Sequence, residues 1–186
     1  MSITRVVRFA GAAGALFLCS VELAGSPALA AGSSAPGGVR VAGHGVDWES
    51  TAVVHSEKQS AAGLIRTSTA TVELEGDLHG WVLYQVTTQI DSAHRTLVNT
   101  GQQVYSGTIL GSEPVLIRDD RFRFEVDTVT GTEHGAVYLM HRLAGPRVQC
   151  ALSVVGTGKR ADGNPTFSYS GECRFAGLVK APAASP

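Results

Sequence analysis

Residues Arg147 to Phe175, RVQCALSVVGTGKRADGNPTFSYSGECRF, decide the fold that this sequence predicts. Two runs of alternating apolar residues flank turn-forming residues at Arg160–Gly163, and each run carries one cysteine. When the segment is folded so that Cys150 faces Cys173, apolar positions meet along both runs. The other facing pairs are Val148 with Phe175, Leu152 with Gly171, Val154 with Tyr169 and Gly156 with Phe167. The stretch therefore predicts a β-hairpin closed by a cross-strand disulfide.

The first 30 residues have the features of a cleavable signal peptide. Arg5 and Arg8 precede an apolar run from Phe9 to Val21, and Ala28-Leu29-Ala30 matches the pattern that signal peptidase cuts. The apolar run is too short to span a bilayer comfortably, so stable membrane insertion is not expected after cleavage. The sequence predicts a secreted or periplasmic protein, cleaved after Ala30.

Composition narrows the class of the mature protein. The chain has 186 residues and a net charge of −1, which indicates one domain and gives no reason to expect nucleic acid as a partner. Cys19 leaves with the signal peptide, so Cys150 and Cys173 remain as a single pair. A single pair in an exported chain favours a disulfide over a reactive thiol.

From residue 39 onward, strand-like alternation replaces any helical periodicity. A polar loop or one short helical turn is predicted at His55–Gly63, and a turn is predicted at Asp119-Asp120. The strands predicted before the hairpin are Val46–Val54, Leu64–Glu75, Leu78–Ile90, Thr96–Leu110, Val115–Ile117, Arg121–Thr128 and Ala136–Leu143. About eight strands at hairpin spacing favour an antiparallel β-barrel, in which closure removes exposed edges; a β-sandwich is the alternative.

The domain boundaries follow from composition. Residues 31–38 are rich in Gly, Ser and Pro and are predicted to be a flexible leader, and residues 178–186 an Ala/Pro-rich flexible tail. The barrel domain is predicted to span residues 39–177.

Three short glycine-centred motifs resemble a known family. Leu74–Gly80 (LEGDLHG), Val104–Thr108 (VYSGT) and Gly156–Gly158 (GTG) are similar to segments of the small β-barrels related to allene oxide cyclase and dirigent proteins. The resemblance covers roughly residues 64–175. It implies an eight-stranded antiparallel barrel with an apolar cavity, and members that are isomerases or cyclases acting on a hydrophobic intermediate. The family's catalytic Glu and Asn do not align with particular positions of this sequence, so no catalytic residue is carried over.

Candidate site residues come from the predicted inner faces of the strands. Tyr84 and Tyr169 would bring phenol groups into the interior, where each needs a partner or a ligand. Phe122 and Phe124 alternate with charged residues and complete the predicted ligand-binding set. His141 shares the predicted inner face of Val137 and Leu139 and is the candidate for proton chemistry, although a lone interior histidine is more often a hydrogen-bonded core residue.

Other site chemistries find little support in the sequence. There is no G-x-S-x-G motif of a serine hydrolase. The six histidines lack the close spacing of a metal site, so no metal and no cofactor is predicted.

The sequence leaves open whether the protein is an enzyme. The leading hypothesis is an exported barrel that binds a small hydrophobic molecule in its lumen. In its sharper form, the protein is a cofactor-free cyclase or isomerase that holds a polyketide-, terpenoid- or lipid-like intermediate in one conformation. The alternatives are a non-catalytic carrier and an exported structural or protein-binding domain. The oligomeric state is left open.

Overall fold

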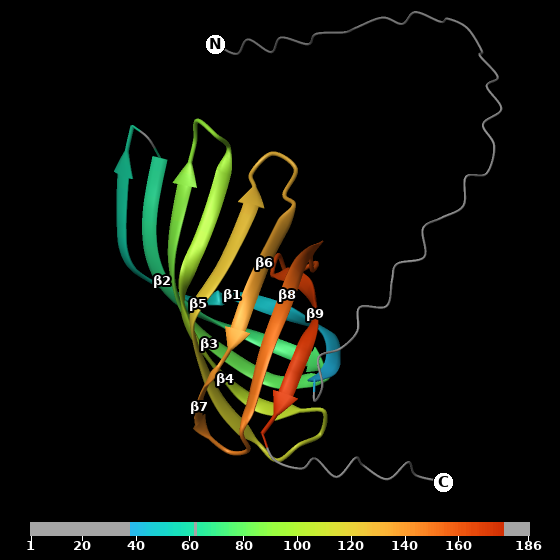
Figure 1. Ribbon diagram of the computed structural model, residues 1–186. Coiled ribbons are helices and arrows are strands. Elements are labelled where there is room, and N and C mark those ends of the chain that lie inside the picture. Colours follow the sequence, from blue (N-terminus) through green and yellow to red (C-terminus); the bar gives the residue numbers. More distant parts are fainter. Residues whose placement is uncertain (1–37, 62, 177–186) are drawn as a thin grey trace, which may run out of the picture. The chain divides into compact units, whose positions relative to one another are not determined.

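The computed structural model describes residues 38–61 and 63–176, which form an all-β unit (Figure 1). The predicted signal peptide, the leader at residues 31–37 and the tail at 178–186 lie outside the described residues. The strands are β1 Gly38–Ser60, β2 Gly63–Gly76, β3 Leu78–Asp91, β4 Thr96–Ile109, β5 Val115–Asp127, β6 Glu133–Leu139, β7 His141–Ala144, β8 Val148–Lys159 and β9 Pro165–Phe175.

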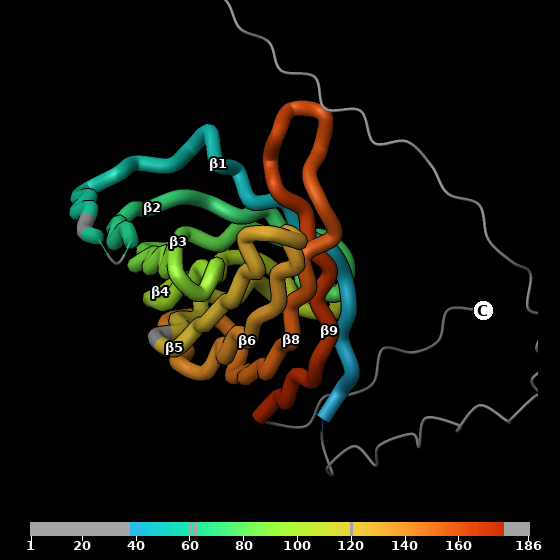
Figure 2. Tube along the Cα trace, turned by 90° about the horizontal axis from the view of Figure 1, so that it is seen from above, coloured from blue at the N-terminus to red at the C-terminus, as the bar shows by residue number. Residues whose placement is uncertain are grey.

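Eight of these strands form a closed ring. Neighbours pair in the order β4-β3-β2-β1-β9-β8-β6-β5, and an additional pairing of β4 with β5 closes the circle (Figure 2). All of the pairings are antiparallel. The short strand β7 pairs with β5 beyond the end of β6. The predicted antiparallel barrel is confirmed, and the sandwich alternative is not the fold.

The hairpin of β8 and β9 has the predicted register. Cys150 faces Cys173, and the other four predicted pairs also face one another. The two sulfur atoms are bonded at 1.96 Å, so the predicted disulfide is confirmed. The turn closes where the Gly163 N–H donates to the Arg160 carbonyl at 3.0 Å. Beyond Gly156 the register shifts by one residue, which marks a β-bulge next to the turn.

The polar loop predicted at His55–Gly63 is wrong, because β1 continues as a strand to Ser60. Polar side chains on the two strands bond to one another across the β1–β2 pair. The Ser56 and Thr67 hydroxyls lie 2.6 Å apart, and the Arg66 Nε donates to Glu57 at 2.8 Å. Cross-strand bonds of this kind let a polar sequence hold a strand without an apolar face.

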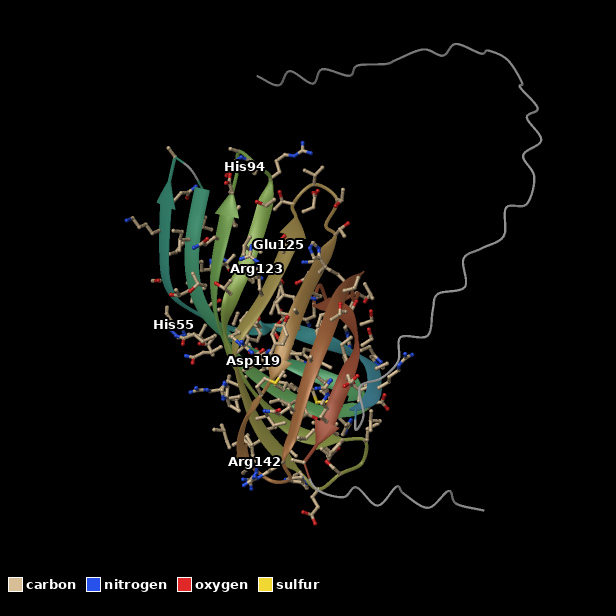
Figure 3. The ribbon with its side chains drawn as sticks, viewed as in Figure 1. His55, His94, Asp119, Arg123, Glu125 and Arg142 are labelled. Carbon is tan, nitrogen blue, oxygen red and sulfur yellow. A yellow bond between two sulfur atoms is a disulfide. The ribbon has the colours of Figure 1, made fainter. Side chains whose placement is uncertain are left out.

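The predicted turn at Asp119-Asp120 is also wrong, because β5 runs without a break from Val115 to Asp127. A register shift opposite Gly101 and Gln103 absorbs the irregularity instead. Asp119, which lies at the middle of the barrel in Figure 3, is 1 % exposed. Its carboxylate accepts bonds from Gln103 Nε2 at 3.1 Å and from the N–H groups of Arg121 and Tyr138, each at 2.8 Å. A turn-forming residue therefore serves here as the anchor of a β-bulge.

The barrel interior has two ends that differ in burial. At the first, which we call the filled end, large apolar side chains pack into one cluster. It includes Leu78, Ile109, Val115, Leu139, Val148 and both cysteines of the disulfide. Toward the other end, which we call the open end, inward positions such as Ile90, Leu97 and Val126 are only half-buried. The filled end is therefore the hydrophobic core, and any ligand site inside the barrel belongs at the open end.

Candidate functional site

A carboxyl–phenol pair lies at the open end. Asp47 is on β1 and Tyr84 is on β3, two strands away. The Tyr84 hydroxyl lies 3.0 Å from Oδ1 and 3.1 Å from Oδ2 of Asp47, so it donates to this carboxylate. Both side chains are half-buried, and Tyr84 packs against the edge of the apolar cluster. The pair therefore places one polar group among apolar walls, where it can bond to a ligand.

Burial sets the protonation of this pair. It raises the pKa of Asp47 to about 6, with the negative charges of Glu49 and Glu133 adding to the effect, while the Tyr84 hydrogen bond and Lys159 oppose it. Burial and the nearby Asp47 also raise the pKa of Tyr84, so the phenol stays protonated. Burial raises the pKa of Glu133 as well. A carboxyl group tuned in this way can exchange a proton near neutral pH.

An aromatic wall continues from Tyr84 along β5. The ring of Phe122 meets Tyr84 edge-on at 6.4 Å between centroids, and Phe124 follows at 5.8 Å from Phe122. The facing strands carry glycine at these positions, because a Cβ on Gly101 or Gly135 would collide with the rings. Tyr84 and Phe124, two of the four predicted ligand-binding residues, are half-buried at the open end, whereas Phe122 between them is 4 % exposed and belongs to the core cluster.

The fourth predicted residue, Tyr169, lies elsewhere. It is 3 % exposed and belongs to the core cluster. Its hydroxyl accepts the Leu78 N–H at 2.8 Å and lies 3.0 Å and 3.1 Å from the carbonyls of Glu75 and Leu78. These bonds tie β9 to the β2–β3 turn, so the Tyr169 hydroxyl is already engaged with the backbone.

The predicted inward position of His141 is wrong. The single expected strand is broken at Met140 into β6 and β7, and all four residues of β7 are exposed. Val137 and Leu139 are buried as predicted, whereas His141 and Leu143 are exposed. His141 pairs in register with Arg118 on the outer face, away from Asp47 and Tyr84. Because His141 is exposed, it cannot transfer a proton to or from a ligand inside the barrel.

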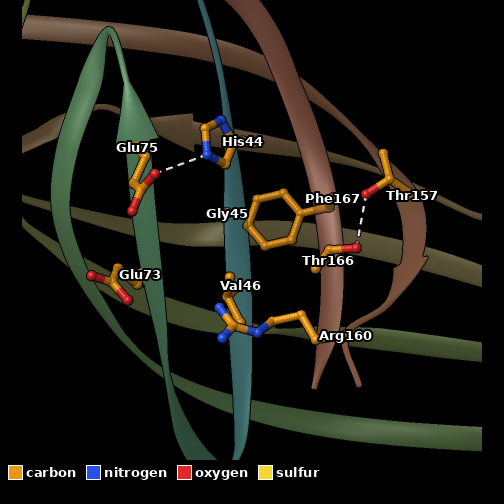
Figure 4. A pocket seen from close by; sticks show the side chains of 9 residues that line it. All are labelled: His44, Gly45, Val46, Glu73, Glu75, Thr157, Arg160, Thr166 and Phe167. Atoms are coloured by element: carbon orange, nitrogen blue, oxygen red, sulfur yellow. Dashed lines mark hydrogen bonds and ion pairs between the residues drawn. The ribbon is translucent and has the colours of Figure 1, made fainter. Parts of the chain in front are cut away.

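A separate groove of about 310 Å³ lies where β1, β2 and the tip of the β8–β9 hairpin meet (Figure 4). Its charged side chains are partnered within the protein. His44 bonds to Glu75 at 2.9 Å, and Glu73 accepts the Trp48 indole N–H at 3.2 Å. Arg160 lies over the Trp48 ring at 5.3 Å and pairs with Asp162 at 3.2 Å. The charged groups of this groove are thus already engaged within the protein.

Sequence reasoning missed Asp47 and Glu133, the two carboxyls of the open end. A signal for Asp47 was present, because it shares the alternation of Gly43 and Gly45 on β1. The strand pairings, in which Gly45 faces Phe167 on β9 and Asp47 faces Val72 on β2, show that this face points inward. Glu133 falls outside the predicted strands, but it begins β6 and lies beside Gly156.

Two further findings concern metal sites and membrane spans in residues 38–61 and 63–176. In this part of the chain, no three His, Cys, Asp or Glu side chains converge as a metal site requires. No helix in the same ranges is long and apolar enough to cross a membrane. The disulfide is compatible with an extracellular location.

No protein-family model, curated protein or solved structure matches this chain. The resemblance of Leu74–Gly80 and the two other glycine-centred motifs to the allene oxide cyclase and dirigent barrels therefore stays a prediction. What the chain does must be argued from its own geometry.

Proposed function

We propose that the protein binds a small, largely apolar molecule at the open end of the barrel, with a polar group of the ligand bonded to Asp47 and Tyr84. The observation that carries the proposal is the convergence of this pair with Phe122 and Phe124 at the point where the apolar core stops. Sites for small molecules typically combine aromatic walls with a few placed polar groups.

The burial of the aromatic wall supports a ligand that covers it. Tyr84 and Phe124 are half-buried although both belong to the inner face of the barrel. An apolar molecule placed against them would remove further apolar surface from water, which is favourable by roughly 25 cal/mol per Å². The filled end sets the depth of the site, because packed side chains occupy the interior there.

Dye binding tests this proposal. We expect the neutral dye N-phenyl-1-naphthylamine to bind with a saturable rise in fluorescence, and Phe124→Ala to weaken that binding by roughly tenfold through lost apolar contact. Val129→Ala is the matched control, because Val129 is 56 % exposed in the loop between β5 and β6. Equal affinity of the two folded variants would contradict the proposed location.

A catalytic role as a cofactor-free isomerase or cyclase is the second candidate, favoured by the pKa of about 6 at Asp47. Such a carboxylate could take a proton from one carbon of a bound molecule and return it to another as the double bond moves. The probe is cyclohex-3-en-1-one, whose conversion to the conjugated enone raises its ultraviolet absorbance. Asp47→Asn should abolish the conversion and retain dye binding. If the wild type converts no faster than this variant, catalysis by Asp47 is refuted while binding stands.

A carrier would share the site but leave its ligand unchanged. Native mass spectrometry of protein purified from its own host separates the two roles. A retained, unmodified apolar molecule that Phe124→Ala fails to retain would identify a carrier.

Export is part of the proposal and rests on the N-terminal sequence and the disulfide. The mature protein recovered outside the cytoplasm should begin at Ala31. N-terminal sequencing of that material checks the cleavage, and a chain that still begins at Met1 would contradict it.

A further inference from the structure

The open end of the barrel has two inward carboxyl groups, which come from strands that do not pair with each other. Asp47 is on β1, where it accepts the Tyr84 hydroxyl. Glu133 is on β6, where it is half-buried and faces Val126, an inward residue of β5. A Cβ on Gly156 would come within 2.9 Å of the Glu133 Cβ, so a glycine leaves room for this side chain. In the ring, β9 and β8 lie between β1 and β6 (Figure 2).

The two carboxyl groups are close enough to influence each other. Burial is the main cause of the raised pKa of Asp47, and the negative charges of Glu49 and Glu133 add to it. Burial also raises the pKa of Glu133, and Glu49 again adds to it. Because the interaction between charges weakens with distance and in water, these effects place the carboxyls near one another in a partly dehydrated space.

Positive side chains of the same end already have partners. Arg66 lies 2.8 Å from Glu57, and Lys159 lies 4.0 Å from Glu49. Within the described part of the chain, by contrast, the Glu133 carboxyl has no hydrogen-bond or ion-pair partner. The interior of the open end therefore carries negative charge that the protein itself does not neutralise.

We propose that the ligand of the open end is an apolar amine, with its protonated nitrogen between Asp47 and Glu133 and its apolar body against the aromatic wall. This inference rests on the proposed ligand site and names the polar group that the ligand brings to it. An ammonium group donates hydrogen bonds to carboxylates, and such charge-assisted bonds are stronger than those of a neutral donor. A carboxylate in a dehydrated site also gains more from a cation than from a neutral group.

The aromatic side chains suit a cation as well as an apolar body. The face of an aromatic ring attracts a cation that lies within about 6 Å of its centre. The Tyr84 ring is half-buried beside the Asp47 carboxylate, so part of its surface is left for a ligand. Because no three metal-ligating side chains converge in the described part of the chain, an organic cation suits the carboxyl pair better than a metal ion.

Three competitors that share one ring system test the charge preference. At about pH 7.5, 1-naphthylmethylamine is cationic, 1-naphthalenemethanol is neutral and 1-naphthoate is anionic. Each is titrated against bound N-phenyl-1-naphthylamine. We expect the amine to displace the dye at a concentration about tenfold or more below that of the alcohol, with the anion weakest. If the dye binds and the alcohol competes as well as the amine, the amine preference is overturned while the proposed ligand site stands. A dye that does not bind removes both.

Two substitutions locate the preference at the inward carboxyls. Glu133→Gln and Asp47→Asn should each weaken the amine by about tenfold, and leave the alcohol and the dye within about twofold. Glu125→Gln is the matched control, because Glu125 lies on the outer face of the same end and its side chain is 45 % exposed. The amine should bind this control like the wild type. An equal loss in the control, or unchanged amine binding in both inward variants, would overturn the proposal.

The pH dependence of binding gives a third measurement. The amine stays protonated between about pH 5 and 7.5, whereas Asp47 loses its proton near its pKa of about 6. The carboxyl is only about one-tenth ionised at pH 5, so the amine should bind about tenfold more tightly at pH 7.5. The alcohol should bind equally at both, and Asp47→Asn should reduce the pH dependence of the amine. An amine affinity that is the same at both pH values in the wild type would overturn the proposal.

Discussion

The two ends of the barrel share one alternation of inward and outward residues but differ in what the inward positions carry. At the filled end these positions hold side chains such as Leu78, Ile109 and Leu139, all 1 % exposed or less. At the open end they include Asp47 and the bonded pair of Thr88 and Asn99, whose side-chain oxygens lie 2.7 Å apart. The backbone pattern is the same, so side-chain chemistry alone divides the interior into a core and a candidate site.

This difference separates stability from binding within one barrel. Burial of apolar surface at the filled end stabilises the fold. At the open end, desolvation of Asp47 opposes folding and is tolerated because the core lies elsewhere. Changes at the filled end should therefore alter unfolding, and changes at the open end should mainly alter ligand binding and pH dependence.

The largest predicted effect is a difference in unfolding free energy when isoleucine is replaced by alanine at each end. Ile109→Ala removes a fully buried side chain at the filled end and should lower the free energy of unfolding by about 2–5 kcal/mol. Ile90→Ala, at the half-buried open end, should cost about 1 kcal/mol or less. Urea denaturation measures both, and equal losses would remove the distinction between the ends.

The disulfide should give the next largest effect. The bond closes a loop with a sequence separation of 23, which corresponds to about 3 kcal/mol in the chain-entropy model. A Cys150→Ala/Cys173→Ala variant should therefore melt well below the oxidised wild type. Calorimetry checks this, and coincident melting curves would show that the bond adds nothing to stability.

Removing the hydroxyl group from each of the two inward tyrosines allows the two ends to be compared. Tyr169→Phe leaves the Leu78 N–H without its buried partner and should cost about 1–3 kcal/mol. Tyr84→Phe should change stability less and instead raise the pKa of Asp47 further, because the donated hydrogen bond that lowers it is lost. Thermal melts and titration of the Asp47 carboxyl by NMR distinguish the two outcomes.

The smallest effect is the pH dependence that Asp47 confers. Its folded-state pKa of about 6 lies above the ordinary value of 3.8, so its charged form disfavours the folded state. The stability that depends on this group is complete below about pH 4 and is lost as the pH rises through 6. Asp47→Asn should therefore be more stable than the wild type by up to about 2 kcal/mol at pH 8. The advantage should vanish near pH 4, and a constant difference across that range would contradict the raised pKa.

The hairpin of β8 and β9 shows what the sequence can predict. Its register follows from local features: two cysteines, a turn at Arg160–Gly163, and apolar positions that match only when Cys150 faces Cys173. The closed barrel followed from repeated hairpin spacing. In the hairpin and in most strand pairs of the barrel the interacting residues are near neighbours along the chain, and the β1–β9 pair is the exception.

The failures occur where a distant partner decides the local structure. Asp119 has the composition of a turn, but Gln103 on β4 and the Tyr138 backbone hold it inside a bulged strand. The strand breaks at Met140, which leaves His141 on the outside of the barrel. The alternation of apolar and polar residues in the sequence gives no sign of this break. Asp47 belongs to the inner face because β1 pairs with β2, where Asp47 faces Val72. The aromatic residues of the candidate site were therefore predictable from the sequence, whereas its carboxyl groups were not.

The pairing of β1 with β9, which we call the seam, has a consequence for the order of folding. Gly43 and Gly45 on β1 leave space that the Tyr169 hydroxyl and the Phe167 ring of β9 occupy, so the first strand meets the last with side chains supplied by the last. Contacts this distant along the chain form slowly, because a long loop must close first. The β8–β9 hairpin forms locally, and the seam must wait for it. Closure of the barrel is therefore expected to be the rate-limiting step of folding.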